Sequence, residues 1–124
     1  MGFAAPCGVV ALLTDFGLRD HYAGAMKGAM LTARPQVRPV DVTHEVQPYA
    51  VEQGAFFLEQ VWRRFPEGTV FCAVVDPGVG GARRALAVAC AGRYGIGPDN
   101  GLFERALALD EPEARALDVD RFAV

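Results

Sequence analysis

Short apolar runs alternate with helix-like patterns along this chain. Continuous apolar runs that end on polar or turn-forming residues are typical of buried strands, whereas apolar residues spaced by three and four favour helices. The predicted strands are 9–13, 37–42, 69–75, 85–91, 94–96 and 115–119. The predicted helices are 22–33, a segment from Pro48 to Phe65, and 102–109, with a Gly-Pro-Asp-Asn-Gly turn at 97–101.

The first five of these elements follow the order strand, helix, strand, helix, strand. This order implies parallel strands joined by right-handed crossovers. We therefore expect an α/β fold, a three-layer sandwich with a mainly parallel sheet and helices on both faces. Each of the first two helices has an apolar stripe, and the stripe of the second should face the core. These stripes are Tyr22, Ala23, Met26, Ala29, Met30 and Ala33 in the first, and Val51, Ala55, Leu58, Val61, Trp62 and Phe65 in the second.

Composition and charge fit one globular domain over residues 1–124, because 52% of the residues are hydrophobic and 22% are charged. A net charge of −3 without a basic stripe gives no electrostatic footprint for nucleic acid. No apolar run reaches the ~20 residues of a membrane span, and no signal peptide pattern is visible. The three cysteines lack metal-ligand spacing, so we expect small buried hydrophobes in a reducing compartment, the cytoplasm, and no metal.

The most informative segment is the loop after the third predicted strand, from Asp76 to Arg84. Its proline and three glycines in four positions allow the backbone to approach a ligand closely. Arg83 follows Asp76 by seven residues, so the loop could fold back and place a guanidinium beside a carboxylate. Such a pair suits a small polar species held between the two charges. A surface salt bridge at a strand-ending turn is the alternative.

Polar residues follow the first two predicted strands as well, namely Asp15 and His44. Ligands of open α/β sheets bind outside the carboxyl ends of the strands, so Asp15, His44 and Asp76 predict a site at that edge. Each residue also has a structural alternative. Asp15 could cap the following turn, His44 could be a hydrogen-bonded structural histidine, and Asn100 could serve only its turn. There is no Walker or Gly-x-Gly-x-x-Gly loop, so nucleotides held by those devices are not expected.

Seven ordered motifs between Val9 and Phe103 resemble the S-adenosylmethionine hydroxide adenosyltransferase family, which is related to bacterial fluorinase and chlorinase. The motifs are Leu-Thr-Asp-Phe-Gly at 13–17, the Asp20 to Gly28 segment, Val-Asp-Val-Thr-His at 40–44, Gly-Ala at 54–55, Phe-Pro-Glu-Gly-Thr-Val at 65–70, Val-Asp-Pro-Gly-Val-Gly at 75–80 with Arg83 and Arg84, and Gly-Pro-Asp-Asn-Gly-Leu at 97–102. The resemblance implies hydrolysis of S-adenosyl-L-methionine to adenosine and L-methionine, by attack of water or hydroxide on C5′ of the ribose. The small molecule is then the substrate, and no cofactor is implied.

By this resemblance Asp76 and Arg83 are the catalytic residues that serve the attacking water. Asp15 would bind the ribose hydroxyls, and Tyr49 lies where the related halogenases carry an aromatic residue against the substrate. Asp20 and Asn100 are further candidate substrate-binding residues. The halogenases carry other side chains at the Asp76 and Val79 positions, so retention of the Asp-Arg pair argues for water rather than halide.

The chain departs from the family in one respect. The family's catalytic histidine lies downstream of the Pro-Asp-Asn-Gly turn, in a segment that this chain does not reach, and the C-terminal β-rich domain is absent. In family trimers the site lies between subunits. We therefore expect the N-terminal domain of a larger homo-oligomeric enzyme, with an incomplete site of its own. A non-catalytic module that binds adenosine or S-adenosylmethionine, and a structural remnant without ligand, stay open as alternatives.

Overall fold

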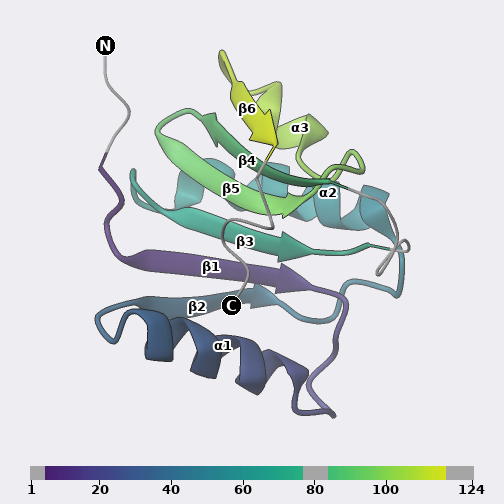
Figure 1. The fold of residues 1–124 in the computed structure, drawn as a ribbon. Helices are drawn as coiled ribbons and strands as arrows, with labels where there is room; N and C mark the ends of the chain where they lie inside the picture. The colour runs from purple at the N-terminus through teal and green to yellow at the C-terminus, as the bar shows by residue number, and fades with distance from the viewer. Residues whose placement is uncertain (1–4, 77–83, 117–124) are drawn as a thin grey trace.

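The computed structural model describes residues 5–76 and 84–116 of the chain. Strand and helix alternate in its first part, as predicted (Figure 1). The elements are β1 (Val9–Thr14), α1 (Tyr22–Ala33), β2 (Arg38–Thr43), α2 (Val51–Val61), the 3₁₀ turn η1 (Trp62–Arg64), β3 (Val70–Val74), β4 (Ala85–Cys90), β5 (Arg93–Pro98), α3 (Glu104–Leu107) and β6 (Glu113–Ala116).

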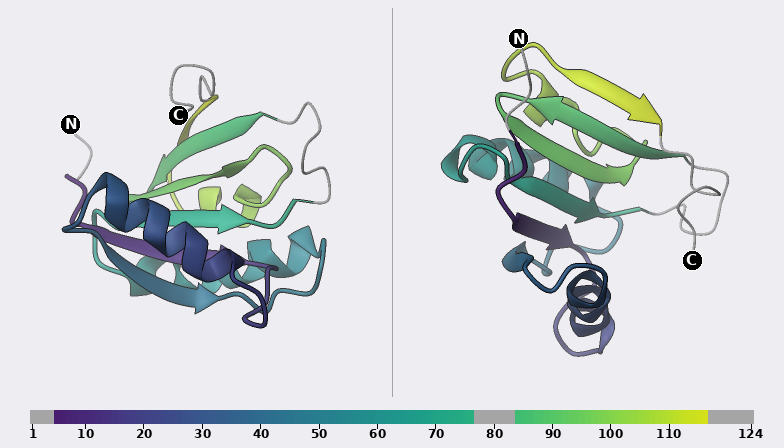
Figure 2. Two further views of the ribbon diagram at one scale, coloured as in Figure 1. Left: turned by 60° about the horizontal axis from the view of Figure 1, so that its bottom comes forward. Right: turned by 60° about the vertical axis from the view of Figure 1, so that its left-hand side comes forward.

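The six strands form one sheet in the order β2-β1-β3-β5-β4-β6. β1 pairs in parallel with β2 and β3, and β3 pairs in parallel with β5. β4 is antiparallel to both β5 and β6. Helix α1 lies on one face of the sheet, and α2 and α3 lie on the other (Figure 2). The predicted α/β sandwich with a mainly parallel sheet is confirmed.

Element ends differ from the predictions where pairing overrides the local sequence signal. β5 runs on to Pro98, into residues predicted as a turn, because Gly97 pairs with Leu86 and Pro98 with Ala85 of β4. The second helix ends at Val61 and tightens into η1, and the third is shorter than predicted. Of the predicted strand 115–119, the first two residues belong to β6 and the others lie outside the described residues.

The core lies between the sheet and the α2–α3 layer, and Trp62 is its centre. Trp62 is completely buried, and its ring stacks on Phe71 with 4.5 Å between ring centroids. The ring of Phe103 meets it edge-on, and the indole N–H donates a 2.8 Å hydrogen bond to the carbonyl oxygen of Cys90. The buried indole is therefore both packed and satisfied. The α2 stripe faces this core, as predicted.

Helix α1 covers much less of its own face. Of its predicted apolar stripe only Ala23 is buried, whereas Tyr22 is 54% exposed and Ala29 and Ala33 are exposed. The apolar stripe of this helix is therefore mostly outside the core. The helix lies toward the β2 side of the sheet (Figure 2), and most of its residues are exposed. Farther along the same sheet face, Ile96 of β5 stays 42% exposed.

Close backbone packing at Gly97 gives a test of this architecture. A Cβ at Gly97 would collide with the backbone oxygen of Ala73 and lie 3.0 Å from the Phe103 ring. Gly97→Ala should therefore lower the free energy of unfolding by about 1–3 kcal/mol, the usual cost of overpacking. Gly28→Ala is the matched control, because its Cβ meets no atom within 4 Å in exposed α1. Since alanine favours helix, the control should gain about 0.5–1 kcal/mol. Equal urea midpoints for Gly97→Ala and the unmodified chain would contradict the packing.

Candidate active site

Three strand ends meet at one edge of the sheet. Thr14, the last residue of β1, pairs with Val74, the last residue of β3, and Leu13 pairs with Thr43 at the end of β2. Neighbouring strands lie about 4.8 Å apart, so the residues that follow these ends are brought together. In Figure 1 this carboxyl edge lies to the right. The predicted polar residues at this edge are Asp15, His44 and Asp76.

Asp15 is half-buried and holds the loop that leads into α2. Its Oδ2 accepts a 2.9 Å hydrogen bond from the backbone N–H of Tyr49. Tyr49 has a φ of 64°, a left-handed conformation that is unfavourable for a bulky residue, and its side chain is 67% exposed. Asp15 does not cap α1, whose N-cap residue is His21. A carboxylate accepts several hydrogen bonds, so Asp15 keeps capacity for a ligand.

His44 is buried in a polar network that crosses three elements. Its ring Nδ1 lies 2.7 Å from Thr14 Oγ1, and its Nε2 lies 2.8 Å from Asp41 Oδ1 on β2. The second oxygen of Asp41 accepts a 2.8 Å bond from Lys27 Nζ of α1. Partial burial raises the pKa of Asp41, but the hydrogen bonds from Lys27 and His44 outweigh it and leave the pKa below its usual range. The geometry supports the structural alternative for His44.

The side chain of Asn100 also forms its hydrogen bonds with backbone groups of the protein. Its Nδ2 donates to the Val75 carbonyl oxygen at 2.8 Å, and its Oδ1 accepts from the Leu102 N–H at 3.1 Å. The preceding residue, Asp99, donates its N–H to the carbonyl oxygen of Arg84 at 2.8 Å. The turn is thus bonded to the backbone on both sides of residues 77–83. These bonds set where Asp76 and Arg84 lie.

Of the remaining predicted site residues, Asp76 and Asp20 lie within the described part of the chain and Arg83 lies outside it. Asp76 is half-buried just beyond β3, whereas Arg83 and the glycines of its loop lie outside the described residues. The pairing of Arg83 with Asp76 therefore stays a prediction. Asp20 is exposed in the loop between β1 and α1. Residues 5–76 and 84–116 contain neither a helix long and apolar enough to cross a membrane nor a group of three His, Cys, Asp or Glu suited to a metal.

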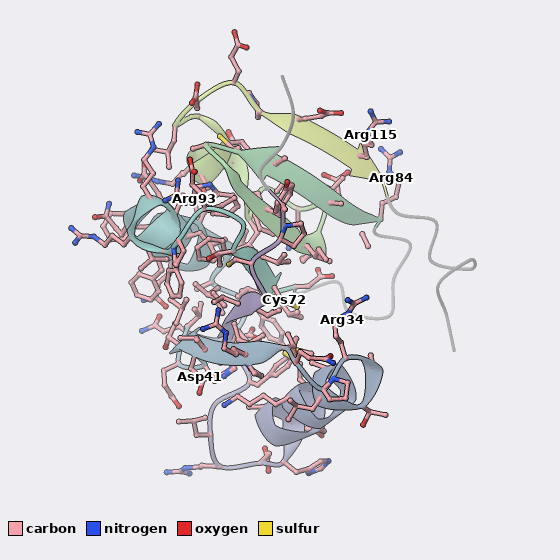
Figure 3. The ribbon with its side chains drawn as sticks, turned by 90° about the vertical axis from the view of Figure 1, so that its left-hand side faces the viewer. Arg34, Asp41, Cys72, Arg84, Arg93 and Arg115 are labelled. Atoms are coloured by element: carbon pink, nitrogen blue, oxygen red, sulfur yellow. The ribbon has the colours of Figure 1, made fainter. Side chains whose placement is uncertain are left out.

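A pocket of 570 Å³ lies at the opposite end of the sheet, beside the β4–β5 turn. Arg93 lines this pocket, and Figure 3 labels it beside α2. The Arg93 guanidinium donates to the carbonyl oxygens of Phe65, Ala91 and Arg63, so it holds the chain together there. This pocket is remote from the carboxyl edge, and we assign it no part in the site.

The sequence interpretation missed Thr14, Asp41 and Lys27, which complete the His44 network. Two signals could have indicated them. Asp41 precedes His44 by three residues at the end of a strand, and Thr14 stands directly before Asp15. Only the register between β1 and β2 shows that the Thr14 hydroxyl and the His44 ring share one buried space.

Replacing Asn100 tests whether its turn is fixed as described. Asn100→Ala leaves the buried Val75 carbonyl and the Leu102 N–H without their side-chain partners. The free energy of unfolding should fall by about 1–3 kcal/mol, the cost of unmade buried hydrogen bonds. Asp99→Ala is the neighbouring control, because it keeps the backbone bond to Arg84 and removes only an exposed 3.8 Å ion pair. Its effect should stay within about 0.5 kcal/mol in the same denaturation series. Equal losses in both variants would show that the Asn100 bonds do not hold the turn.

Comparison with known proteins connects this edge to one family. The chain is 45% identical over 103 residues to an (R)-S-adenosyl-L-methionine hydrolase of Thermus thermophilus, a match that covers 83% of the chain and 40% of the relative. It is 39% identical over 80 residues to a fluorinase of Nocardia brasiliensis, covering 64% of the chain and 27% of that protein. The chain thus spans about 40% of the length of the hydrolase relative.

The fold comparison agrees with the sequence comparison. The crystal structure of a conserved hypothetical protein from Thermus thermophilus superposes with a TM-score of 0.80 and 42% sequence identity. The superposition covers 95% of this chain and 49% of that one. The family model for the SAM hydroxide adenosyltransferase N-terminal domain matches residues 10–123, nearly the whole chain. The chain therefore belongs to the S-adenosylmethionine hydroxide adenosyltransferase family, of which it is an N-terminal domain.

Proposed function

We propose that this domain belongs to a hydrolase that converts S-adenosyl-L-methionine to adenosine and L-methionine. The observation that carries the proposal is the pair of carboxylates, Asp15 and Asp76, that β1 and β3 deliver to one edge of the sheet. Identity of 45% to a protein named (R)-S-adenosyl-L-methionine hydrolase supports the same substrate, in its (R) form. In the proposed reaction water attacks C5′ of the ribose.

The proposed reaction requires the protein mainly to position the substrate and the attacking water. The leaving group departs from a sulfonium as neutral methionine, so no general acid is needed. A water must instead be held in line with the C5′–S bond and lose its proton as the new bond forms. Asp76 would orient that water or accept its proton. Arg83 would stabilise its hydroxide character, since arginine does not act as a base at neutral pH.

Substrate binding would use the neighbouring loops. Asp15 would accept hydrogen bonds from the ribose hydroxyls while its Oδ2 holds the Tyr49 N–H. The exposed ring of Tyr49 would lie against the substrate, and Asp20 would contribute from the β1–α1 loop. Asn100 would act through the turn that it holds, because backbone groups engage its own polar atoms.

The rest of the site would come from outside this chain. We expect the family's downstream histidine and C-terminal domain, in a trimer whose subunits share each site, to complete it. The isolated 124-residue chain should then release no adenosine. The cysteines Cys7, Cys72 and Cys90 are free, which suits the cytoplasm that we propose as its location. A module that binds adenosine without turnover is the alternative function.

Replacing Asp76 tests the proposed function directly. In the intact protein, Asp76→Ala should lower adenosine release from S-adenosylmethionine by ~10²-fold or more, because the water loses its orienting carboxylate. Chromatography of adenosine and methionine after timed incubation measures the rate. Asp110→Ala, an exposed carboxylate lining the pocket at the opposite end of the sheet, is the control and should keep normal turnover.

Three results would count against the proposal. Near-normal turnover in Asp76→Ala would remove the role of Asp76. Tight adenosine binding by the unmodified intact protein without any product would favour the binding module. Faster product formation with chloride or fluoride than with water alone would identify halide as the nucleophile.

A further inference from the structure

Asp15 lies inside a turn that is bonded on both sides to the His44 loop. The Thr14 carbonyl oxygen accepts the N–H of Val46 at 3.3 Å, and the N–H of Gly17 donates to the His44 carbonyl oxygen at 2.6 Å. Within the turn, the N–H of Phe16 donates to Thr14 Oγ1 at 3.1 Å. The residues on either side of Asp15 are therefore joined through one hydroxyl.

The direction of each hydrogen bond in this network can be assigned. Asp41 is a carboxylate and only accepts, so the hydrogen of the His44 ring sits on Nε2. When the ring is neutral, Nδ1 is the acceptor, and the Thr14 hydroxyl donates to it. The lone pairs of that hydroxyl oxygen remain available for the Phe16 N–H. If the ring were protonated, Nδ1 would donate, and the hydroxyl hydrogen would lose its acceptor.

Burial makes this arrangement strict. Thr14 is completely buried and His44 is 2% exposed, so water cannot readily replace a missing partner. The Lys27 ammonium on the outer side of Asp41 keeps that carboxylate charged and in place. A continuous series of hydrogen bonds thus connects α1, through β2, to the turn that carries Asp15.

We propose that Thr14 and His44 are positioning residues that set the Asp15 carboxylate for binding the ribose hydroxyls. The inference rests on the proposed function for the identity of the ligand, but the positioning of Asp15 is a property of the protein itself. A carboxylate that accepts hydrogen bonds from two adjacent hydroxyls must be fixed in direction, because misplacement weakens both bonds together. The His44 ring fixes the hydroxyl, the hydroxyl fixes the turn, and the turn fixes Asp15.

Three substitutions in the intact protein separate positioning from general stability. Thr14→Val removes the hydroxyl at nearly constant volume, and Thr14→Ser keeps it. His44→Asn loses the bond to Asp41 that holds the hydrogen-bond partner of the Thr14 hydroxyl in place. Thr69→Val is the matched control, because Thr69 is an equally buried threonine at the opposite edge of the sheet. Asp15→Ala is the reference for complete loss of the carboxylate.

The first readout needs no ligand. Hydrogen exchange of the Tyr49 amide reports the bond from that amide to Asp15 Oδ2. Exchange should accelerate in Thr14→Val and His44→Asn, approach that of Asp15→Ala, and return to normal in Thr14→Ser. In Thr69→Val the Tyr49 amide should exchange as in the unmodified protein. Unchanged Tyr49 exchange in both Thr14→Val and His44→Asn would overturn the positioning role.

The second readout is adenosine affinity, measured by calorimetric titration, with KM and kcat for S-adenosylmethionine. Thr14→Val should raise the adenosine dissociation constant and KM about tenfold with a smaller change in kcat, and Thr14→Ser should restore both. Equal affinity in Thr14→Val and Thr69→Val would overturn the inference. If the unmodified protein binds no adenosine, the proposed ligand is wrong. The role of Thr14 and His44 in ribose binding is then wrong as well, even if Tyr49 exchange changes as expected.

Discussion

The hydrogen bond between the Thr14 hydroxyl and the His44 ring joins the ends of β1 and β2 inside the protein. Everything at the carboxyl edge is arranged around it. The turn that carries Asp15 follows Thr14 directly. The loop that presents Tyr49 follows His44, and the Tyr49 backbone N–H donates a hydrogen bond to the Asp15 carboxylate. Because both side chains are buried, this bond couples the hydrogen position on the ring to the orientation of the hydroxyl.

The main core packs against one face of the sheet, and it holds the strands whose ends form the carboxyl edge. On the α2–α3 face, Trp62, Phe71 and Phe103 pack as a dense aromatic centre that fixes β3 and β5. β3 in turn carries Asp76, and Asn100 after β5 bonds to the Val75 carbonyl beside it. The other face is covered by α1 only near β1 and β2 (Figures 2 and 3). The packed core therefore lies between the sheet and the α2–α3 layer, while the candidate site residues lie at the carboxyl edge.

Strand and helix order could be predicted because apolar runs and helical spacing are local properties of the sequence. The same locality explains the errors. Gly97 and Pro98 carry strong turn signals, yet they extend β5 because β4 lies beside them. The apolar stripe of α1 resembles that of α2, but α1 lies toward the β2 side of the sheet, and only Ala23 of its stripe is buried.

The site could be predicted as far as each residue follows a strand. Parallel topology places Asp15, His44 and Asp76 at one edge whatever their roles are. The roles depend on partners that no local pattern contains, such as Thr14 and Asp41 for His44, or Val75 for Asn100. Motifs in the same order and spacing as in a known family indicate the reaction. The hydrogen bonds of the structure show which residues are held in place by others.

The proposed reaction is attack of water on C5′ of the substrate at this edge, and the fate of the water oxygen is its direct test. The intact protein would be incubated with S-adenosylmethionine in water labelled with heavy oxygen, and both products analysed by mass spectrometry. The account predicts one labelled oxygen in adenosine, at its 5′ hydroxyl, and none gained by methionine. Unlabelled adenosine, or label in the amino-acid product, would mean that a different bond is broken and would contradict the account.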